Sequence, residues 1–457
     1  MDSSSKTPAA INDPRLDPEE RLAALRQGVP GISSGMEKNG NGEVNNHIHT
    51  IYSFSPYTPS MAALKAREAG LEAAGSVDHD SWAAAPEMIA ACAALGMGGC
   101  SGFEIRVSFK TGPGGKPGPM ADRKINNPDS AGLVYMTIQG IPSTAQESTA
   151  AFLKPIREFR LKRTRQMTEA ANVILAEAAL EAIDYERDLI QKSQYLRGGE
   201  ITERHLLAAA AEKIITRYGR GIELVQGLRR DLTIPVEPSQ EKFLADPANP
   251  HYLYDLLGVL KTGFLPLFFI QPDENECIPA KDAVDFALSI GAIPAYAYLG
   301  DVGNSPTGDK KAEKFEDDFL SELFEELHRL GYRAVTYMPP RNSPAQIEGI
   351  QALCARGGLM EISGVDINSS RQSFNCPEVL SPRCRHLVDT TWALIAHERL
   401  ASVDSSWALF SSANPFYSLS LQERIILYAR AGRSLDLYHP EESVPRLIEE
   451  LLKGRLP

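Results

Sequence analysis

The hydrophobic and polar positions of the chain form two blocks in which short apolar segments alternate with amphipathic ones. In the first block, Val44–Thr50 alternates apolar and polar residues, and Ser76–Asp80 and Gly102–Ile105 are further strand-like segments. Between the first two, small apolar residues repeat at helical spacing up to Gly70, a residue type that commonly ends helices. The order strand, helix, strand predicts an α/β fold.

The second block carries predicted strands at Gly291–Tyr298 and Tyr332–Tyr337. The sequence between the two blocks is predicted to be mainly helical, with alanine-rich helices at Glu169–Ala182 and His205–Tyr218. Thr202 is placed to cap the second helix, and for the histidine that opens it we expect a capping or surface role. Near its end, the apolar run Gly263–Ile270 is too short to span a bilayer and is predicted to be a buried strand.

The two ends of the chain are predicted to carry no chemistry. Residues 1–43 read as a leader with one short helix, capped by Asp17, and a linker at Gly31–Gly42. Ser418–Ala431 and Glu442–Gly454 are amphipathic helices, which we expect to cover the fold or to make a contact between subunits of a homo-oligomer.

Composition and charge restrict the class of protein further. A chain of 457 residues with 43% hydrophobic residues is typical of a soluble globular protein, and its net charge of −12 argues against nucleic-acid binding. We find no stretch long enough to cross a membrane and no hydrophobic core of a signal peptide. The six cysteines lack Cys-x-x-Cys spacing, as expected for reduced thiols in a cytoplasmic protein.

Histidines and carboxylates gather at the ends of the first three predicted strands. His47 and His49 lie two residues apart on one strand, so their rings should point the same way. His79 stands between two aspartates, and Glu104 lies in the third strand. Imidazole and carboxylate are the usual ligands of zinc, manganese and iron, although a lone His-x-His pair is equally typical of two hydrogen-bonded histidines on a strand.

The order of these segments resembles the opening of the polymerase and histidinol phosphatase (PHP) superfamily, and Gly364–Asn368 resembles that family's closing Asp-x-His motif. The resemblance implies a distorted α/β barrel of (β/α)7 type with a helical insertion and C-terminal helices. The implied organisation is a leader and linker at 1–43, barrel parts at 44–110 and 286–400, a mainly helical insertion at 111–285, and C-terminal helices at 401–457.

In PHP enzymes with three metals, one metal is held by a set that this chain keeps complete: His47, His49, Glu104 and Asp366. The second metal's positions read Phe54, His79 and Asn368 here. The third metal's two histidine positions are matched by Thr137 and Tyr298. The losses fall on two sites and spare the first, so the resemblance predicts one divalent transition metal: zinc, manganese or iron.

The same resemblance suggests catalytic roles. Asp366 is placed to take the proton of a metal-activated water, and His79, without a metal of its own, becomes a candidate general acid. The alternative for His79 is a hydrogen bond to Asp78 or Asp80 that orients the barrel rim. Tyr298 is a candidate hydrogen-bond donor to developing negative charge.

Four residues in the late loops are candidates for binding an anionic substrate: Arg341, Asn368, Arg371 and Lys310. For Lys310, in a polar glycine-rich loop, a flexible linker with the lysine in water is an equal alternative. The basic cluster Arg157–Arg165 is expected to be the solvated face of a long helix rather than a ligand site.

Together these features predict a metal-dependent hydrolase for a small anionic substrate, with a phosphate monoester first. A second hypothesis is non-phosphate chemistry at the single metal, either hydrolysis of a C–N or C–O bond or a lyase step. A third is a catalytically silent binding protein, against which the complete ligand set argues.

Overall fold

The computed structural model describes residues 7–28, 40–127, 130–302 and 314–455. Seven strands of this described chain form one sheet in sequence order. Strands β1 to β3 are parallel, β4 is antiparallel to both neighbours, and β5 to β7 are again parallel. The strands are β1 (Val44–Ile48), β2 (Ala73–His79), β3 (Gly98–Ser108), β4 (Leu133–Gln139), β5 (Ile293–Ala297), β6 (Ala334–Tyr337) and β7 (Met360–Ser363).

The segment after β7 nearly closes this sheet into a barrel. The His49 backbone N–H donates to the Ile367 carbonyl at 2.9 Å, and the Ile367 N–H donates to the His47 carbonyl at 3.1 Å. The Asn45 side chain bonds both the N–H and the carbonyl of Val365. The predicted α/β barrel is therefore observed, and its closing segment brings the end of the second block beside β1.

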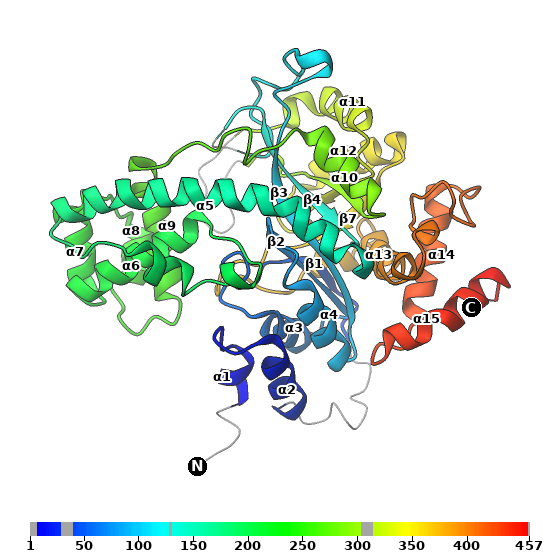
Figure 1. Ribbon diagram of the computed structural model, residues 1–457, viewed down its shortest axis with the longest axis horizontal. Coiled ribbons are helices and arrows are strands. Elements are labelled where there is room, and N and C mark those ends of the chain that lie inside the picture. Colours follow the sequence, from blue (N-terminus) through cyan, green and yellow to red (C-terminus); the bar gives the residue numbers. More distant parts are fainter. Residues whose placement is uncertain (1–6, 29–39, 128–129, 303–313, 456–457) are drawn as a thin grey trace.

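Helices connect the strands and cover the outside of the barrel. Thr58 caps the first of these by accepting a hydrogen bond from the Met61 N–H at 3.1 Å, and proline at its first position suits the helix start. Figure 1 shows such helices both below and above the strands. The helices are α3 (Pro59–Glu68), α4 (Ala85–Ala94), α10 (Ala280–Ser289), α11 (Leu320–Leu330), α12 (Pro344–Gly357) and the largely buried α13 (His386–Val403).

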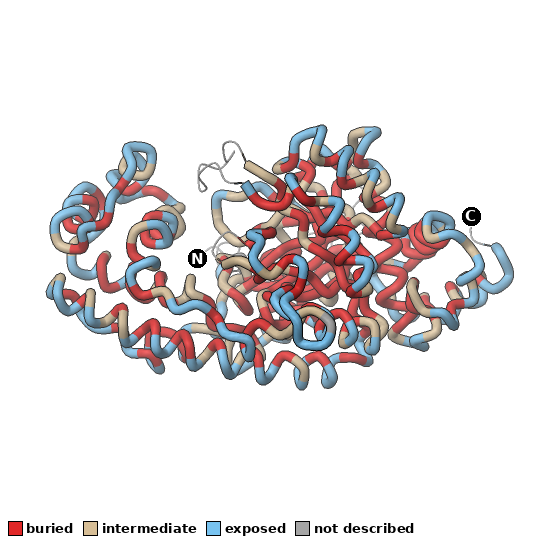
Figure 2. Tube along the Cα trace, turned by 90° about the horizontal axis from the view of Figure 1, so that it is seen from above, coloured by how far each residue is buried: buried red, intermediate tan, exposed pale blue. Residues whose placement is uncertain are grey.

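A second helical unit extends from one side of the barrel (Figures 1 and 2). The long helix α5 runs from the barrel into this unit, which has a hydrophobic cluster of its own. Its helices are α5 (Gln146–Glu177), α6 (Glu203–Tyr218), α7 (Ile222–Asp231), α8 (Pro238–Leu244) and α9 (Tyr252–Gly263), with a π-helical segment at Tyr185–Ile190. The range predicted as the insertion, 111–285, also contains β4, so its helical part begins only at Gln146.

Two local predictions in this unit had different outcomes. The capping role of Thr202 and His205 is confirmed, since the His205 Nδ1 accepts a hydrogen bond from the Thr202 N–H at 3.0 Å. The buried strand at Gly263–Ile270 was wrong. Helix α9 ends there, a 3₁₀ turn at Leu265–Leu267 follows, and Leu267 is 57% exposed. Pro266 suits such a turn, and it cannot donate a strand hydrogen bond.

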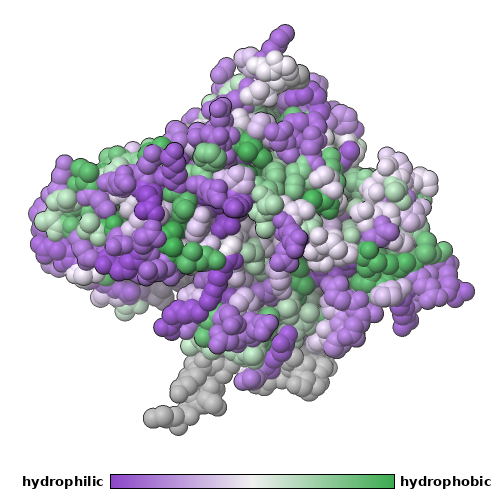
Figure 3. Space-filling model, viewed as in Figure 1, coloured by the Kyte–Doolittle hydropathy of each residue, from purple (hydrophilic) through white to green (hydrophobic). Residues whose placement is uncertain are grey.

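Both ends of the chain pack on the barrel. In place of one short helix, α1 (Thr7–Ile11) and α2 (Pro18–Gly28) are present, and α2 packs on α3 and α4 through a buried ion pair between Arg21 and Glu87. Asp17 caps α2 as predicted. At the other end, α14 (Leu421–Ser434) and α15 (Pro440–Leu452) pack against α13, where hydrophobic residues gather at the right of Figure 3.

No helix in the described ranges is long and apolar enough to cross a membrane. All six cysteines lie in the described ranges, and each is buried and outside any disulfide.

Candidate metal centre

Three histidines and two carboxylates converge at the carboxyl ends of β1 and β2, beside the middle of β3. Ligand atoms of His47, His49 and Glu104 all lie within 4.8 Å of one another. The His49 Nε2 is 3.3 Å from Asp366 Oδ1, because the closing segment carries Asp366 to the end of β1. The residues of the predicted four-ligand set therefore lie together.

The charges of this cluster suit a metal cation. Burial lowers the pKa of His49 to about 3, so its imidazole is neutral at neutral pH. Burial opposes ionisation of Glu104 and Asp366, but the neighbouring histidines outweigh it and lower the pKa of each carboxyl to about 2. Neutral imidazoles beside ionised carboxylates are the donor forms that a divalent transition metal requires, so these residues fit such an ion.

Further hydrogen bonds hold the cluster in place. Asp78 accepts hydrogen bonds from the Thr50 N–H at 2.7 Å and from the Ser53 hydroxyl at 2.6 Å, and thereby fixes the loop after β1. The Ser53 hydroxyl also lies 3.3 Å from the His49 Nδ1. Such partners behind the ligands orient the rings and set which nitrogen faces the metal.

His79 lies beside the metal cluster. It pairs with Glu104 across β2 and β3, and its Nδ1 lies 3.0 Å from Glu104 Oε2. The alternative in which His79 bonds a flanking aspartate was wrong, because Asp78 holds the β1 loop and Asp80 bonds Arg160. The His79 side chain is 30% exposed, so a substrate can reach it.

The predicted substrate-binding residues of the late loops are bonded to the fold itself. Arg371 makes two hydrogen bonds to Asp255 of α9, at 2.6 and 2.7 Å, and stacks over Phe243. The Arg341 Nε donates to the Leu299 carbonyl. Asn368 donates its side-chain N–H to Asp366 Oδ1 at 2.7 Å, which makes it a support for that carboxylate. Lys310 lies outside the described residues.

Tyr298 is likewise engaged elsewhere. It is buried, and its hydroxyl donates to Asp317 Oδ1 at 2.6 Å, at the start of the helical segment that leads into α11. The predicted donation to a substrate therefore does not agree with this arrangement. The reason is a carboxylate 19 residues away, which the strand pattern of the sequence did not reveal.

Two residues that the sequence interpretation missed lie at the centre. Arg204, at the start of α6, donates to the Asn368 carbonyl at 3.1 Å, and its charge helps to lower the pKa of Asp366. Tyr135 of β4 has its ring centroid 6.0 Å from that of His79. Both residues come from the range predicted as an insertion. The polar residues next to the Thr202 cap were the available signal for Arg204.

A buried ion network lies beside His79 and ties α5 to the barrel. Arg160 bonds Asp80 and Glu276, and Arg163 bonds Glu276 and Glu203. Arg160 is only 3% exposed, so the predicted solvated face was wrong for these two arginines, although Lys162 and Arg165 are exposed. Buried arginines need paired carboxylates, and those partners come from distant parts of the chain.

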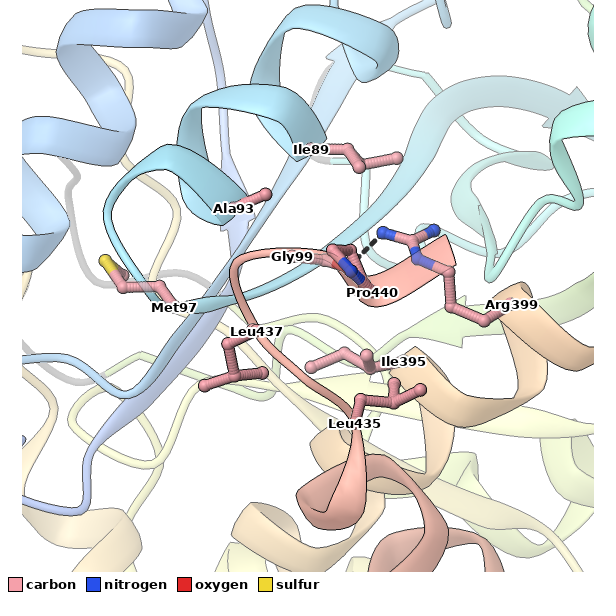
Figure 4. Close-up of a pocket in the computed structure, with 10 residues that line it drawn as sticks. Ile89, Ala93, Met97, Gly99, Ile395, Arg399, Leu435, Leu437 and Pro440 are labelled. Atoms are coloured by element: carbon pink, nitrogen blue, oxygen red, sulfur yellow. Dashed lines mark hydrogen bonds between the residues drawn. The ribbon is translucent and has the colours of Figure 1, made fainter. Parts of the chain in front are cut away.

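A separate cavity at the other end of the barrel strands offers no second candidate site. It lies between α4, α13 and the start of α15, where the Arg399 Nη2 donates to the Gly99 carbonyl at 3.2 Å (Figure 4). Its volume is about 10 Å³, room for one water at most, and its lining is mainly apolar.

Comparison with known proteins gives limited similarity. No protein-family model and no curated protein matches the chain. Among solved structures, an amidohydrolase from Chromobacterium violaceum, with bound sulfate and no metal, matches with a TM-score of 0.46 and 19% identity, covering 75% of this chain and 95% of that one. A protein from Bifidobacterium adolescentis described as a putative metal-dependent phosphoesterase matches with a TM-score of 0.46 and 17% identity, covering 75% and 96%.

Proposed function

We propose that this chain is a metal-dependent hydrolase of the PHP type that acts on a small anionic substrate, with a phosphate monoester as the first choice. One observation carries the proposal. His47, His49, Glu104 and Asp366 converge, and the ionised carboxylates of Glu104 and Asp366 lie with the neutral His49 imidazole. A cluster of this kind is costly to bury unless it binds a cation.

The residues around the cluster divide the reaction between them. A divalent transition metal bound there would lower the pKa of a water and polarise the scissile bond. Asp366, whose side chain is 37% exposed, accepts the proton of the attacking water, while the Asn368 amide keeps the carboxylate in place. His79 donates from its Nε2 to the leaving oxygen as the P–O bond breaks, and Glu104 holds its Nδ1–H.

We further propose a single metal. The position of an early aspartate ligand in the family is taken by Phe54, whose ring packs 5.0 Å from that of His205. Asn368 uses its amide N–H on Asp366, an orientation suited to supporting that carboxylate. Both features support a mononuclear centre and also favour the second candidate function, hydrolysis of a C–N or C–O bond or a lyase step, because one metal cannot clamp both attacking and leaving oxygens.

An anionic substrate is favoured by Arg204. Arg204 belongs to the insertion, donates one N–H to the Asn368 carbonyl at 3.1 Å, and its charge helps to lower the pKa of Asp366. Arginine forms strong hydrogen bonds with phosphate and carboxylate oxygens.

Metal analysis of untreated protein together with a screen of phosphate esters tests the proposal. We expect one transition metal per chain and release of phosphate from a small monoester. Two or three tightly held metals would reject the mononuclear centre but not hydrolysis. Protein that binds no transition metal and hydrolyses no ester, amide or lactone would overturn the proposed function and leave the silent binding protein.

A further inference from the structure

Tyr135 occupies a defined place beside the metal cluster. In the antiparallel pair of β3 and β4, Glu104 lies opposite Thr137 and Arg106 lies opposite Tyr135. Side chains two residues apart share a face of a strand, so Tyr135 is on the face of Glu104, one step further toward the mouth of the barrel. Its ring lies beside that of His79, with the centroids 6.0 Å apart.

Three buried tyrosines of the barrel donate their hydroxyl groups to protein partners, whereas Tyr135 is only partly buried. Tyr298 and Tyr337 donate to the carboxylates of Asp317 and Glu361, and Tyr332 donates to the sulfur of Met136. Within the described residues we find no hydrogen bond from the Tyr135 hydroxyl, although it is not sealed from solvent. A donor left without a protein partner at the edge of a polar cluster is available to a ligand.

The surroundings keep this hydroxyl protonated. Burial raises the pKa of Tyr135 to about 12, Arg106 opposes that shift, and Glu203 and Glu104 add to it. The group is therefore a neutral donor at neutral pH.

We propose that Tyr135 is a catalytic residue, whose hydroxyl donates a hydrogen bond to the substrate oxygen that gains negative charge during hydrolysis at the centre. This inference rests on the proposed function. A fixed donor in a site with little water stabilises charge that develops in the transition state more than charge already present in the substrate. The sequence suggested this role, hydrogen-bond donation to developing negative charge, for Tyr298. Here it falls to Tyr135, two positions from Thr137 on β4.

Tyr135→Phe tests the role in the full-length, metal-loaded protein with the best ester from the screen. We expect kcat to fall about 10²-fold, as for loss of one oxyanion donor, with KM and metal content nearly unchanged. Tyr332→Phe is the matched control. It also deletes a tyrosine hydroxyl next to β4, but on the face where Met136 lies, and should leave kcat unchanged.

Binding of orthovanadate and of orthophosphate, each titrated calorimetrically into the metal-loaded protein, gives a readout independent of turnover. Vanadate adopts a five-coordinate form that resembles the transition state, so Tyr135→Phe should weaken vanadate binding about tenfold and phosphate binding much less. Equal binding of vanadate by wild type and variant, or a kcat within threefold of wild type, would overturn the role of Tyr135 while leaving the hydrolase proposal intact. A wild-type protein that binds metal but neither anion, and releases no phosphate from any ester, would reject both the role of Tyr135 and the phosphate monoester as substrate.

Discussion

The two halves of the barrel use the side chains at their strand ends differently. At the carboxyl ends of β1 and β2 and beside them on β3, the histidines contact carboxylates of the cluster, as His79 contacts Glu104 at 3.0 Å. After β5 and β6, polar side chains bond to nearby loops, as Tyr298 does to Asp317 and Arg341 to the Leu299 carbonyl. Asp366 follows β7 but belongs to the first set, because its segment hydrogen-bonds to β1.

This difference distinguishes residues that are available to bind a ligand from residues that stabilise the fold. Groups that face one another around a common point keep lone pairs for a cation. Tyr298 has no second donor for a substrate, because its one hydroxyl hydrogen is used on Asp317. The comparison therefore assigns chemistry to the early half and loop stability to the late half.

The largest effect is expected from the ligands of the early half. His47→Ala or Asp366→Ala should remove the metal and abolish hydrolysis, since each variant loses one of four ligands, while the helical content stays nearly unchanged. Metal analysis, activity and circular dichroism measure these outcomes. His386→Ala is the control from the late half: its Nε2 lies 3.1 Å from Glu361 Oε2, a comparable histidine–carboxylate pair. Loss of metal in the control, or full metal in either ligand variant, would contradict the division.

His79→Ala should give the next largest effect. The variant should keep its metal but lose about 10² to 10⁴-fold in turnover, the usual contribution of a positioned acid. The loss should be large for an alkyl phosphate and small for p-nitrophenyl phosphate, because nitrophenolate leaves without needing a proton. An equal loss with both substrates would show that His79 only positions Glu104, and loss of metal would make it a ligand.

The sequence predicted those residues of the site whose positions follow from the strands alone. His47, His49 and Glu104 sit on or next to strands, and the pairing of β2 with β3 makes His79 and Glu104 neighbours. It missed Tyr135 because nearly all of Leu133–Gln139 is buried on both faces of the sheet, so no alternation of polar and apolar residues marks the strand.

The sequence also failed to predict the partners of long arginine side chains. Arg160 bonds a carboxylate 80 residues away, and Arg371 bonds one 116 residues away. Only the packing of the insertion on the barrel brings these partners close to the arginines. Spacing along a helix cannot distinguish a solvated arginine from a buried one whose partner is distant in sequence.

The buried network offers a third test of medium size. Arg160→Met should lower the free energy of unfolding by about 3–5 kcal/mol, since it leaves Asp80 and part of Glu276 buried without their partner. Arg165→Met on the same helix breaks the exposed pair with Glu186 and should cost less than about 1 kcal/mol. Denaturant unfolding of both variants compares them, and equal losses would mean that the network is not desolvated.

The smallest effect is expected from Arg371, which the sequence predicts to bind the substrate. Its side chain is 38% exposed and bonds Asp255, so Arg371→Ala should lower the free energy of unfolding by about 0.5–1 kcal/mol and change KM less than twofold. Asp255→Ala should cost more, because it also loses the hydrogen bond from the Asn249 amide at 2.6 Å, and the double variant should cost little more than Asp255→Ala, since the contact with Arg371 is then lost only once. A tenfold rise of KM in Arg371→Ala but not in Asp255→Ala would show that Arg371 binds the substrate. The late half of the barrel would then share in recognition, and the division between the two halves would hold only for the chemical step.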